Sequence, residues 1–351
     1  MSSAPTLART GLRLTAILGV GALVLASCGT TLVKAQRLNG TPALSISVPL
    51  SNIGCTLNDV CVAVGTSSAS VGPTSVGEFA TPSGRWLAVA LPVTSQPSIT
   101  SAACSGTQCL LAGSVSGRDL LWRFDAASHS VSIANPPPGG NGVSALTCND
   151  LNCALIDSSA PTSSPRFSFS ADGGVTWSNP LAMTWANGDV ITSTSCGQVF
   201  NCAVSAVSAS HQLEVFITRD DGATWVQRST PNSWTTLTSL SCVGLDCVGL
   251  ATIGGASALV RSSTFARTWT HVSLPQHANA LSCVAMTLCV VVGQNSKALA
   301  WLATVRGTTT VTSPLRYVPT PLLGVACGSK VCAAIGVTTV LSLPLALKSG
   351  T

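Results

Sequence analysis

The chain has 351 residues, of which 46% are apolar and only 8% are charged, whereas about 25% are charged in an ordinary soluble protein. This composition excludes an intrinsically disordered chain, because disorder requires low hydrophobicity and high charge. The 17 Lys and Arg against 12 Asp and Glu leave a net charge of +5, which is too thinly spread for a nucleic-acid-binding face. No apolar run approaches the roughly 20 residues of a membrane-spanning helix. The fifteen cysteines indicate an oxidising compartment.

Residues 1–27 have the pattern of an export signal. Arg9 and Arg13 precede an apolar stretch over 14–25, and small residues precede a cleavage site. The segment Leu25-Ala26-Ser27-Cys28 resembles the lipobox of bacterial lipoproteins, in which the cysteine thiol receives a diacylglycerol. An ordinary secretory signal with a chance cysteine is the alternative. The resemblance implies a lipidated Cys28, a tether over 28–41, and a folded part over 42–351 held outside the cytoplasm on a bacterial cell membrane by its lipid.

The other fourteen cysteines fall into seven close pairs. Four or five residues separate the two partners of each pair, and the first cysteines of successive pairs lie 49, 44, 48, 46, 41 and 44 residues apart. A period in the forties indicates a repeat architecture. The pairs are Cys55/Cys61, Cys104/Cys109, Cys148/Cys153, Cys196/Cys202, Cys242/Cys247, Cys283/Cys289 and Cys327/Cys332.

Each repeat has enough β-rich sequence for four strands. The residues flanking each cysteine pair predict two strands joined by a tight hairpin, and segments such as 258–261 and 269–274 predict two more. Four strands in about 45 residues, seven times over, predict an all-β fold: a seven-bladed β-propeller of four-stranded antiparallel blades. A cysteine on each arm of a hairpin is placed to form one disulfide per blade. Zinc binding is the alternative, but the spacing is wrong and the four histidines are scattered.

The seventh repeat is one strand short, because it ends soon after the segment 339–343. Residues 42–50 resemble the closing strands of other repeats, so we expect them to complete the last blade and cover its open edge. The alternative is that Leu345-Ala-Leu-Lys348 fills the gap, which Pro344 disfavours.

Two repeats contain the pattern S/T-x-D-x-G-x-T-W, 48 residues apart and at the same offset. The pattern resembles the Asp-box, or BNR repeat, of sialidases, sortilin-type receptors and photosystem-assembly propellers. The resemblance implies a turn between the third and fourth strands, in which the aspartate bonds backbone N–H groups, the glycine takes unusual dihedrals and the tryptophan packs between blades. Residues 262–269 look like a decayed copy with Thr264 and Ala266 replacing Asp and Gly. The two matches are Ser170, Asp172, Gly174, Thr176 and Trp177, and Thr218, Asp220, Gly222, Thr224 and Trp225.

We expect these aspartates to stabilise the fold rather than to catalyse a reaction or bind calcium, because in the resembling families the box lies away from the active site. The cysteine hairpins and the boxes belong to the same end of the blades, so a ligand would use the opposite end. Candidate ligand-binding residues there are Trp185, Asp189, His211, Trp234, Arg316 and Tyr317. Each of them could instead be a packing or solvated loop residue.

The residues that a sialidase requires are not found together. Tyr317 is the single tyrosine, Glu78 and Glu214 are the two glutamates, and no arginine triad recurs at matching offsets. We therefore expect no catalytic residue, cofactor or metal, and no nucleic-acid partner. The sequence favours a monomeric, non-catalytic binding or assembly platform for an envelope protein or a glycan. The alternatives are a sialidase-like glycoside hydrolase with a degenerate site, using Glu214 or Tyr317, and a purely structural surface protein.

Overall fold

The structure is a computed structural model that describes residues 50–65, 75–80, 85–92, 97–115, 118–139, 143–157, 164–186, 188–197, 201–307, 309–314, 320–336 and 340–344. The predicted export signal, Cys28, the tether, the segment 42–49 and residues 345–348 lie outside the described residues. Within the described ranges, no helix is long and apolar enough to cross a membrane.

The strands form seven antiparallel sheets. The first three contain β1 (Leu50–Cys55), β2 (Cys61–Gly65), β3 (Ser75–Ala80) and β4 (Arg85–Ala90); β5 (Pro97–Ser105), β6 (Gln108–Val115), β7 (Arg118–Asp125) and β8 (Ser130–Ala134); and β9 (Val143–Asn149), β10 (Asn152–Asp157), β11 (Arg166–Ser170) and β12 (Leu181–Ala182). The 3-10 helix η1 (Thr184–Ala186) follows β12.

The next three sheets contain β13 (Val190–Cys196), β14 (Cys202–Val207), β15 (Leu213–Thr218) and β16 (Val226–Arg228); β17 (Trp234–Val243), β18 (Asp246–Ile253), β19 (Ala256–Ser262) and β20 (Thr270–Ser273); and β21 (His277–Ala285), β22 (Leu288–Gln294), β23 (Ala300–Arg306) and β24 (Thr309–Pro314). The last sheet contains β25 (Leu322–Cys327), β26 (Val331–Gly336) and β27 (Val340–Pro344).

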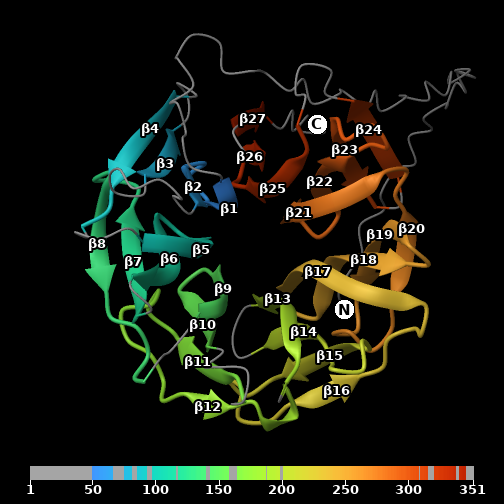
Figure 1. Cartoon of the computed structure of the whole chain (residues 1–351), viewed down its shortest axis with the longest axis horizontal. Coiled ribbons are helices and arrows are strands. Elements are labelled where there is room, and N and C mark those ends of the chain that lie inside the picture. Colours follow the sequence, from blue (N-terminus) through green and yellow to red (C-terminus); the bar gives the residue numbers. More distant parts are fainter. Residues whose placement is uncertain are drawn as a thin grey trace, which may run out of the picture. The chain divides into compact units, whose positions relative to one another are not determined.

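The sheets are arranged as the blades of a β-propeller, which confirms the predicted fold type (Figure 1). The first strand of each blade is innermost, neighbouring inner strands contact one another, and β25 contacts β1 to close the ring. Six blades have four strands, whereas the last has three among the described residues. The predicted closing segment 42–50 is wrong at its last residue, because Leu50 pairs with Gly65 in the first blade. Any closing strand must therefore end before Leu50.

The core lies between neighbouring blades, so both faces of a blade are buried. In β15, Val215 and Ile217 pack with Leu237 of the next blade, whereas Phe216 lies on the opposite face, stacked on Trp185 of the preceding connection. Strands buried on both faces must be apolar almost throughout. This arrangement accounts for the low fraction of charged residues in the sequence.

The seven predicted disulfides are present. In every blade the two cysteines face each other across the hairpin between the first two strands, with Cα atoms 3.9–4.1 Å apart. Each hairpin of the inner ring is thus covalently closed, which stabilises it by about 2 kcal/mol in the chain-entropy description.

The second cysteine of each pair is also a core residue. Their side chains are at most 1% exposed and pack into the apolar clusters between blades. Each disulfide is therefore part of the core and not an exposed functional site. The seven buried partners are Cys61, Cys109, Cys153, Cys202, Cys247, Cys289 and Cys332.

Every inner strand has a one-residue β-bulge near its start. The pairing with the second strand skips one residue, which points that residue away from the ladder and bends the strand. In five blades this residue is Ser, Thr or Asn placed four positions before the first cysteine. The bulge residues are Ser51, Thr100, Ser144, Thr192, Thr235, Asn279 and Leu323.

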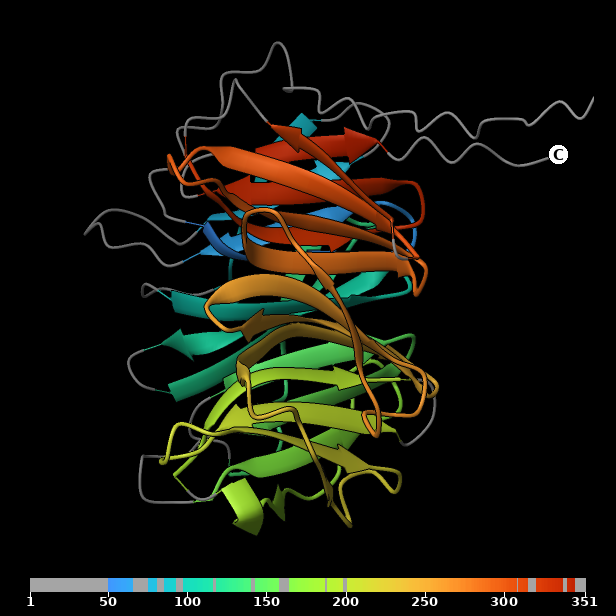
Figure 2. The ribbon, with the colours of Figure 1, turned by 90° about the vertical axis from the view of Figure 1, so that its right-hand side faces the viewer.

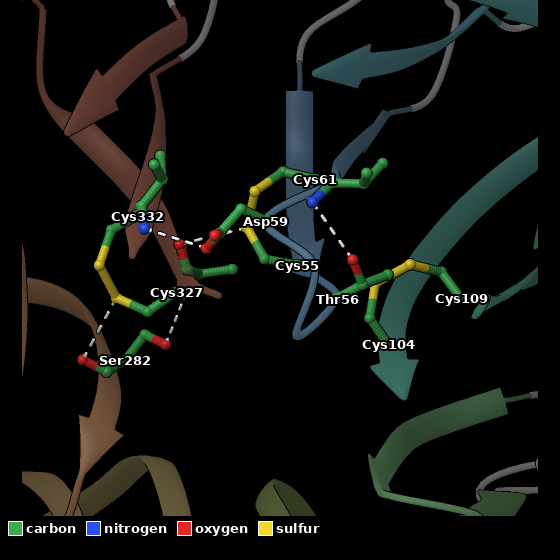
Figure 3. Close-up of a disulfide and its surroundings, with 12 residues drawn as sticks. Cys55, Thr56, Asp59, Cys61, Cys104, Cys109, Ser282, Cys327 and Cys332 are labelled. Carbon is green, nitrogen blue, oxygen red and sulfur yellow. Dashed lines mark hydrogen bonds between the residues drawn. A yellow bond between two sulfur atoms is a disulfide. The ribbon is translucent and has the colours of Figure 1, made fainter. Parts of the chain in front are cut away.

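Polar side chains bridge the free edges of neighbouring inner strands. The Ser195 hydroxyl accepts the backbone N–H of Cys242 at 2.8 Å, and the Ser282 hydroxyl accepts that of Cys327 at 3.0 Å (Figure 3). Such bridges satisfy edge groups that would otherwise be open to pairing with another chain. Further bridges run from Thr192 to Leu237, from Leu240 to Ser193 and from Asn279 to Leu322.

Candidate functional site

The turns gather at two ends of the blades, seen along the two sides of the ring in Figure 2. We call one the hairpin end; it contains the disulfide hairpins and the turns between third and fourth strands, such as 170–177. We call the other the connector end; it contains the turns between second and third strands and the connections between blades. The two ends have different chemistry.

At the hairpin end are the two aspartate turns (170–177 and 218–225), in each of which the aspartate carboxylate accepts hydrogen bonds from groups of the same turn. Asp172 accepts the backbone N–H groups of Val175 and Thr176 at 2.9 Å each and the Thr176 hydroxyl at 2.6 Å. Burial opposes ionisation, but hydrogen bonds from Thr176, Ser170 and Val175 outweigh it and lower the pKa of Asp172 to about 2. The hydrogen bonds of Thr224 likewise lower the pKa of Asp220. Both carboxylates are directed into their own turns.

The glycines of the aspartate turns also fix the contact with the preceding blade. Gly222 has a φ of +86°, and a Cβ there would lie 2.4 Å from Cδ1 of Phe167. Gly174 lies in the same way against Leu110. In the segment 262–269, the hydroxyl of Thr264 accepts the N–H of Thr268 at 2.9 Å in place of an aspartate. These turns therefore join adjacent blades.

Trp185 lies at the connector end, in the connection between the third and fourth blades. Its ring stacks on Phe216 of the fourth blade at a centroid distance of 3.5 Å, and lies 5.5 Å from Trp225. The side chain is half-buried. One face of the indole is thus used in packing, and its Nε1 is buried without a hydrogen-bond partner among the described residues, so only part of the ring is at the surface.

Asp189 and Glu214 lie close to each other at the connector end. Asp189 precedes β13, whose Ile191 pairs with Ala206, and Ala206 pairs with Glu214 across the blade. Burial raises the pKa of Asp189, and burial followed by the Asp189 charge raises that of Glu214. The structure thus brings together two carboxyl groups that the sequence separates by 25 positions, and Trp185 stacks on Phe216 of the strand that contains Glu214.

The remaining candidates occupy different surroundings. His211 is exposed in the turn between β14 and β15, with a φ of +60°. Trp234 begins β17 and is only 6% exposed, with its ring centroid 5.7 Å from that of Trp269; it belongs to the packing between blades. Arg316 and Tyr317 lie outside the described residues.

A cavity of about 370 Å³ lies among the inner strands β1, β17, β21 and β25. Sequence analysis did not identify its residues, because bulges become visible only in the strand register. The recurrence of Ser, Thr or Asn four positions before the first cysteine is the signal that could have found two of them, Ser51 and Asn279. The polar lining residues are Ser51, Asn52, Ser239, Ser241, Asn279 and Ser282.

The described part of the chain contains no cluster of three or more His, Cys, Asp or Glu that could hold a metal ion. The described lining of the central cavity also carries no ionisable side chain, since its one cysteine, Cys283, is in a disulfide. The chemistry available in this cavity is hydrogen bonding by neutral hydroxyl and amide groups.

No protein-family model matches the sequence, and no curated protein matches it at a significant level. Solved structures with a similar fold include YCF48 from Cyanidioschyzon merolae, with 13% identity, a TM-score of 0.63, and coverage of 88% of this chain and 98% of that one. Virginiamycin B lyase from Staphylococcus aureus has 9% identity, a TM-score of 0.60 and coverage of 88% and 97%.

The GH74 xyloglucanase from Xanthomonas campestris has 12% identity and a TM-score of 0.59, and the match covers 86% of this chain and 53% of the xyloglucanase. At such identities the likeness concerns the fold and not the activity. Together with the strand arrangement, it shows that the chain is a β-propeller.

Proposed function

We propose that this protein is a lipid-anchored bacterial surface protein that binds an envelope protein or a glycan at its connector end without catalysing a reaction. The observation that carries the proposal is the gathering of Trp185 and Asp189, from the connection between the third and fourth blades, with Phe216 and Glu214 of β15. An aromatic edge beside hydrogen-bonding groups is a combination used in recognition. At the hairpin end, by contrast, the aspartates are occupied by their own turns.

Similar folds support a binding role. YCF48 has been solved bound to a D1 peptide, and another similar structure is a xyloglucanase. A peptide and a polysaccharide are thus both ligands to consider for a propeller of this kind. The two S/T-x-D-x-G-x-T-W segments fit an Asp-box propeller.

Envelope extracts test this binding role. The tagged full-length protein and its Asp189→Ala variant are crosslinked in the native envelope, and co-purifying proteins and glycans are identified. We expect the variant to lose the partner, whereas Asp150→Ala in a hairpin-end turn retains it. Recovery of no partner by the unaltered protein would instead support a purely structural surface protein.

The proposed lipid anchor is inferred from the segment Leu25-Ala26-Ser27-Cys28. Lipid chains on Cys28 would hold the folded part at the membrane surface. We expect Cys28→Ala to move the protein from the membrane fraction to the soluble fraction, while Thr31→Ala stays with the membrane. A Cys28→Ala protein that remains membrane-bound would contradict the anchor.

The chain before Leu50 would complete a seventh four-stranded blade. In each of the first six blades, the outermost strand directly precedes the innermost strand of the next blade. By the same rule we propose that residues 42–49 pair with β27, which is the edge of the three-stranded sheet among the described residues. Slow amide hydrogen exchange over 43–47 would support this strand, and exchange at the rate of an unstructured peptide would contradict it.

A glycoside hydrolase is the second candidate, and the proximity of Asp189 and Glu214 favours it. Glycosidases place two carboxyl groups about the scissile bond, one of them kept protonated by a raised pKa. Burial raises the pKa of both groups here. Turnover of fluorogenic glycosides that is abolished by Glu214→Gln would establish this candidate and overturn the non-catalytic role.

A further inference from the structure

The inner strand β17 departs from the pattern of the other blades. Its first bulge residue, Thr235, lies seven positions before Cys242, whereas bulge residues such as Thr192 and Asn279 lie four positions before their cysteines. The extra length forms a second bulge between Thr238 and Ser241. The added residues lie on the wall of the central cavity.

Ser239, within this second bulge, has a φ of +51°. Residues other than glycine rarely adopt this conformation. Gly249 lies opposite the bulge, and a Cβ there would lie 2.8 Å from Cδ1 of Leu237. Leu237 thus packs closely on Gly249 at the second bulge, and Ser239 lies at the cavity surface.

Ser241 departs from a second pattern. Ser195 and Ser282 occupy the same position, directly before the first cysteine of their blades, and each accepts a backbone N–H of the next inner strand. In the described part of the chain, the Ser241 hydroxyl has no hydrogen-bond partner, and no side-chain bond joins β17 to β21. The Ser239 hydroxyl has no partner among these residues either. Both residues line the cavity.

From these departures we infer that the cavity among β1, β17, β21 and β25 is a binding subsite for a short neutral saccharide. The inference goes beyond the proposed connector-end role, because this cavity contains none of Trp185, Asp189 and Glu214. Ser239 and Ser241 offer hydroxyl groups that both donate and accept, as sugar hydroxyls require. Asn279 uses its Nδ2 on Leu322 at 2.7 Å, which leaves its oxygen as an acceptor. The volume of about 370 Å³ is within the range of small-ligand sites.

The same lining disfavours other ligands. A charged ligand would lose its hydration without meeting an opposite charge, because the described lining residues are neutral. An extended peptide adds to a sheet by pairing with free backbone groups along an edge. Side chains of neighbouring blades already occupy such groups, including the N–H of Leu240 and the carbonyl of Leu322. Leu323, which is 40% exposed, offers an apolar contact for the C–H face of a sugar ring.

Calorimetric titration of the full-length protein tests this subsite. The probes are neutral tetrasaccharides (cellotetraose, maltotetraose, mannotetraose and chitotetraose), tetragalacturonate as a charged counterpart, and an uncharged Gly/Ser peptide. We expect at least one neutral saccharide to bind, with no binding of tetragalacturonate or the peptide. Ser241→Val and Asn279→Leu should each weaken saccharide binding about tenfold, whereas Ser132→Ala on the outer strand β8 should leave it unchanged.

Hydrogen exchange of the unaltered protein provides a second readout that does not depend on the folding of the variants. A bound saccharide should slow exchange in β17 and β21. Saccharide binding without this protection, or preference for the peptide or tetragalacturonate, would overturn the subsite. If no saccharide binds while a partner is still recovered from the envelope, the subsite is wrong and the binding role stands. If neither binds, both are wrong.

Discussion

Asp59 and Lys330, which are 271 residues apart in the sequence, meet where the propeller ring closes. One oxygen of the Asp59 carboxylate accepts the backbone N–H of Lys330 at 2.7 Å and that of Val331 at 3.0 Å. The other accepts the Ser329 hydroxyl at 3.1 Å. Asp59 is 6% exposed and lies between the first and last disulfide hairpins (Figure 3). A carboxylate of the first blade thus organises the hairpin of the last.

Replacing Asp59 should weaken the closed ring. Asp59→Ala removes the acceptor for two backbone N–H groups and places alanine at a φ of +63°, so we expect a loss of about 3 kcal/mol in the free energy of unfolding. Urea denaturation measures this loss. Asp150→Ala is the matched control, because Asp150 also has a positive φ in a hairpin but is exposed. Equal losses in the two variants would show that the bonds to the last hairpin contribute nothing.

The sequence was sufficient for the repeat, the hairpins and the disulfides, because each depends on residues close together in the chain. The role of Asp59 could not be predicted, since its partners are supplied by the other end of the ring. Trp234 was a candidate ligand-binding residue with packing as the alternative, and the structure bears out the packing, because it begins β17 and is buried against a neighbouring blade. The second bulge at Ser239 depends on strand register, and the proximity of Asp189 to Glu214 depends on the packing of the third connection against the fourth blade.

A side chain at Gly222 should separate the third and fourth blades. Gly222→Ala would place a Cβ 2.4 Å from the Phe167 ring and put alanine at a φ of +86°. We expect a loss of about 2–3 kcal/mol in stability, from overpacking together with backbone strain. Gly254→Ala is the control, because Gly254 has a φ of +56° with no atom within 4 Å of the added Cβ. In Gly254→Ala the free energy of unfolding, measured by the same urea denaturation, should fall by only about 1 kcal/mol. An equally small loss in Gly222→Ala would mean that Phe167 moves aside freely.

The aspartate turns should make the protein sensitive to acid. The pKa of Asp172 is lowered from 3.8 in the unfolded reference to about 2 in the fold. When folding lowers the pKa of a carboxyl group, the stability it contributes is present above the pKa of the unfolded protein. This stability is lost as the pH falls through the pKa of the folded protein. The melting temperature of Asp172→Asn should therefore be below that of the unaltered protein at pH 7, with a difference that narrows between pH 4 and pH 2. A difference independent of pH would show that the carboxylate charge is not what the turn requires.

Glu214 should have the opposite pH dependence. Burial and the neighbouring Asp189 raise the pKa of Glu214 above 4.5 in the folded protein. The stability that its protonated form contributes is fully present below the pKa of the unfolded protein, and it is lost as the pH rises through the pKa of the folded protein. At pH 7 the ionised Glu214 therefore destabilises the fold, and Glu214→Gln removes this charge with little change in shape. We expect the variant to have a higher melting temperature than the unaltered protein at pH 7 and an equal one below pH 4, measured by thermal unfolding. Asp172→Asn, measured alongside, should shift the melting temperature at pH 7 in the other direction. A lower melting temperature of Glu214→Gln at pH 7 would mean that the carboxylate has a favourable partner, which would argue against Glu214 as a group left free for a ligand.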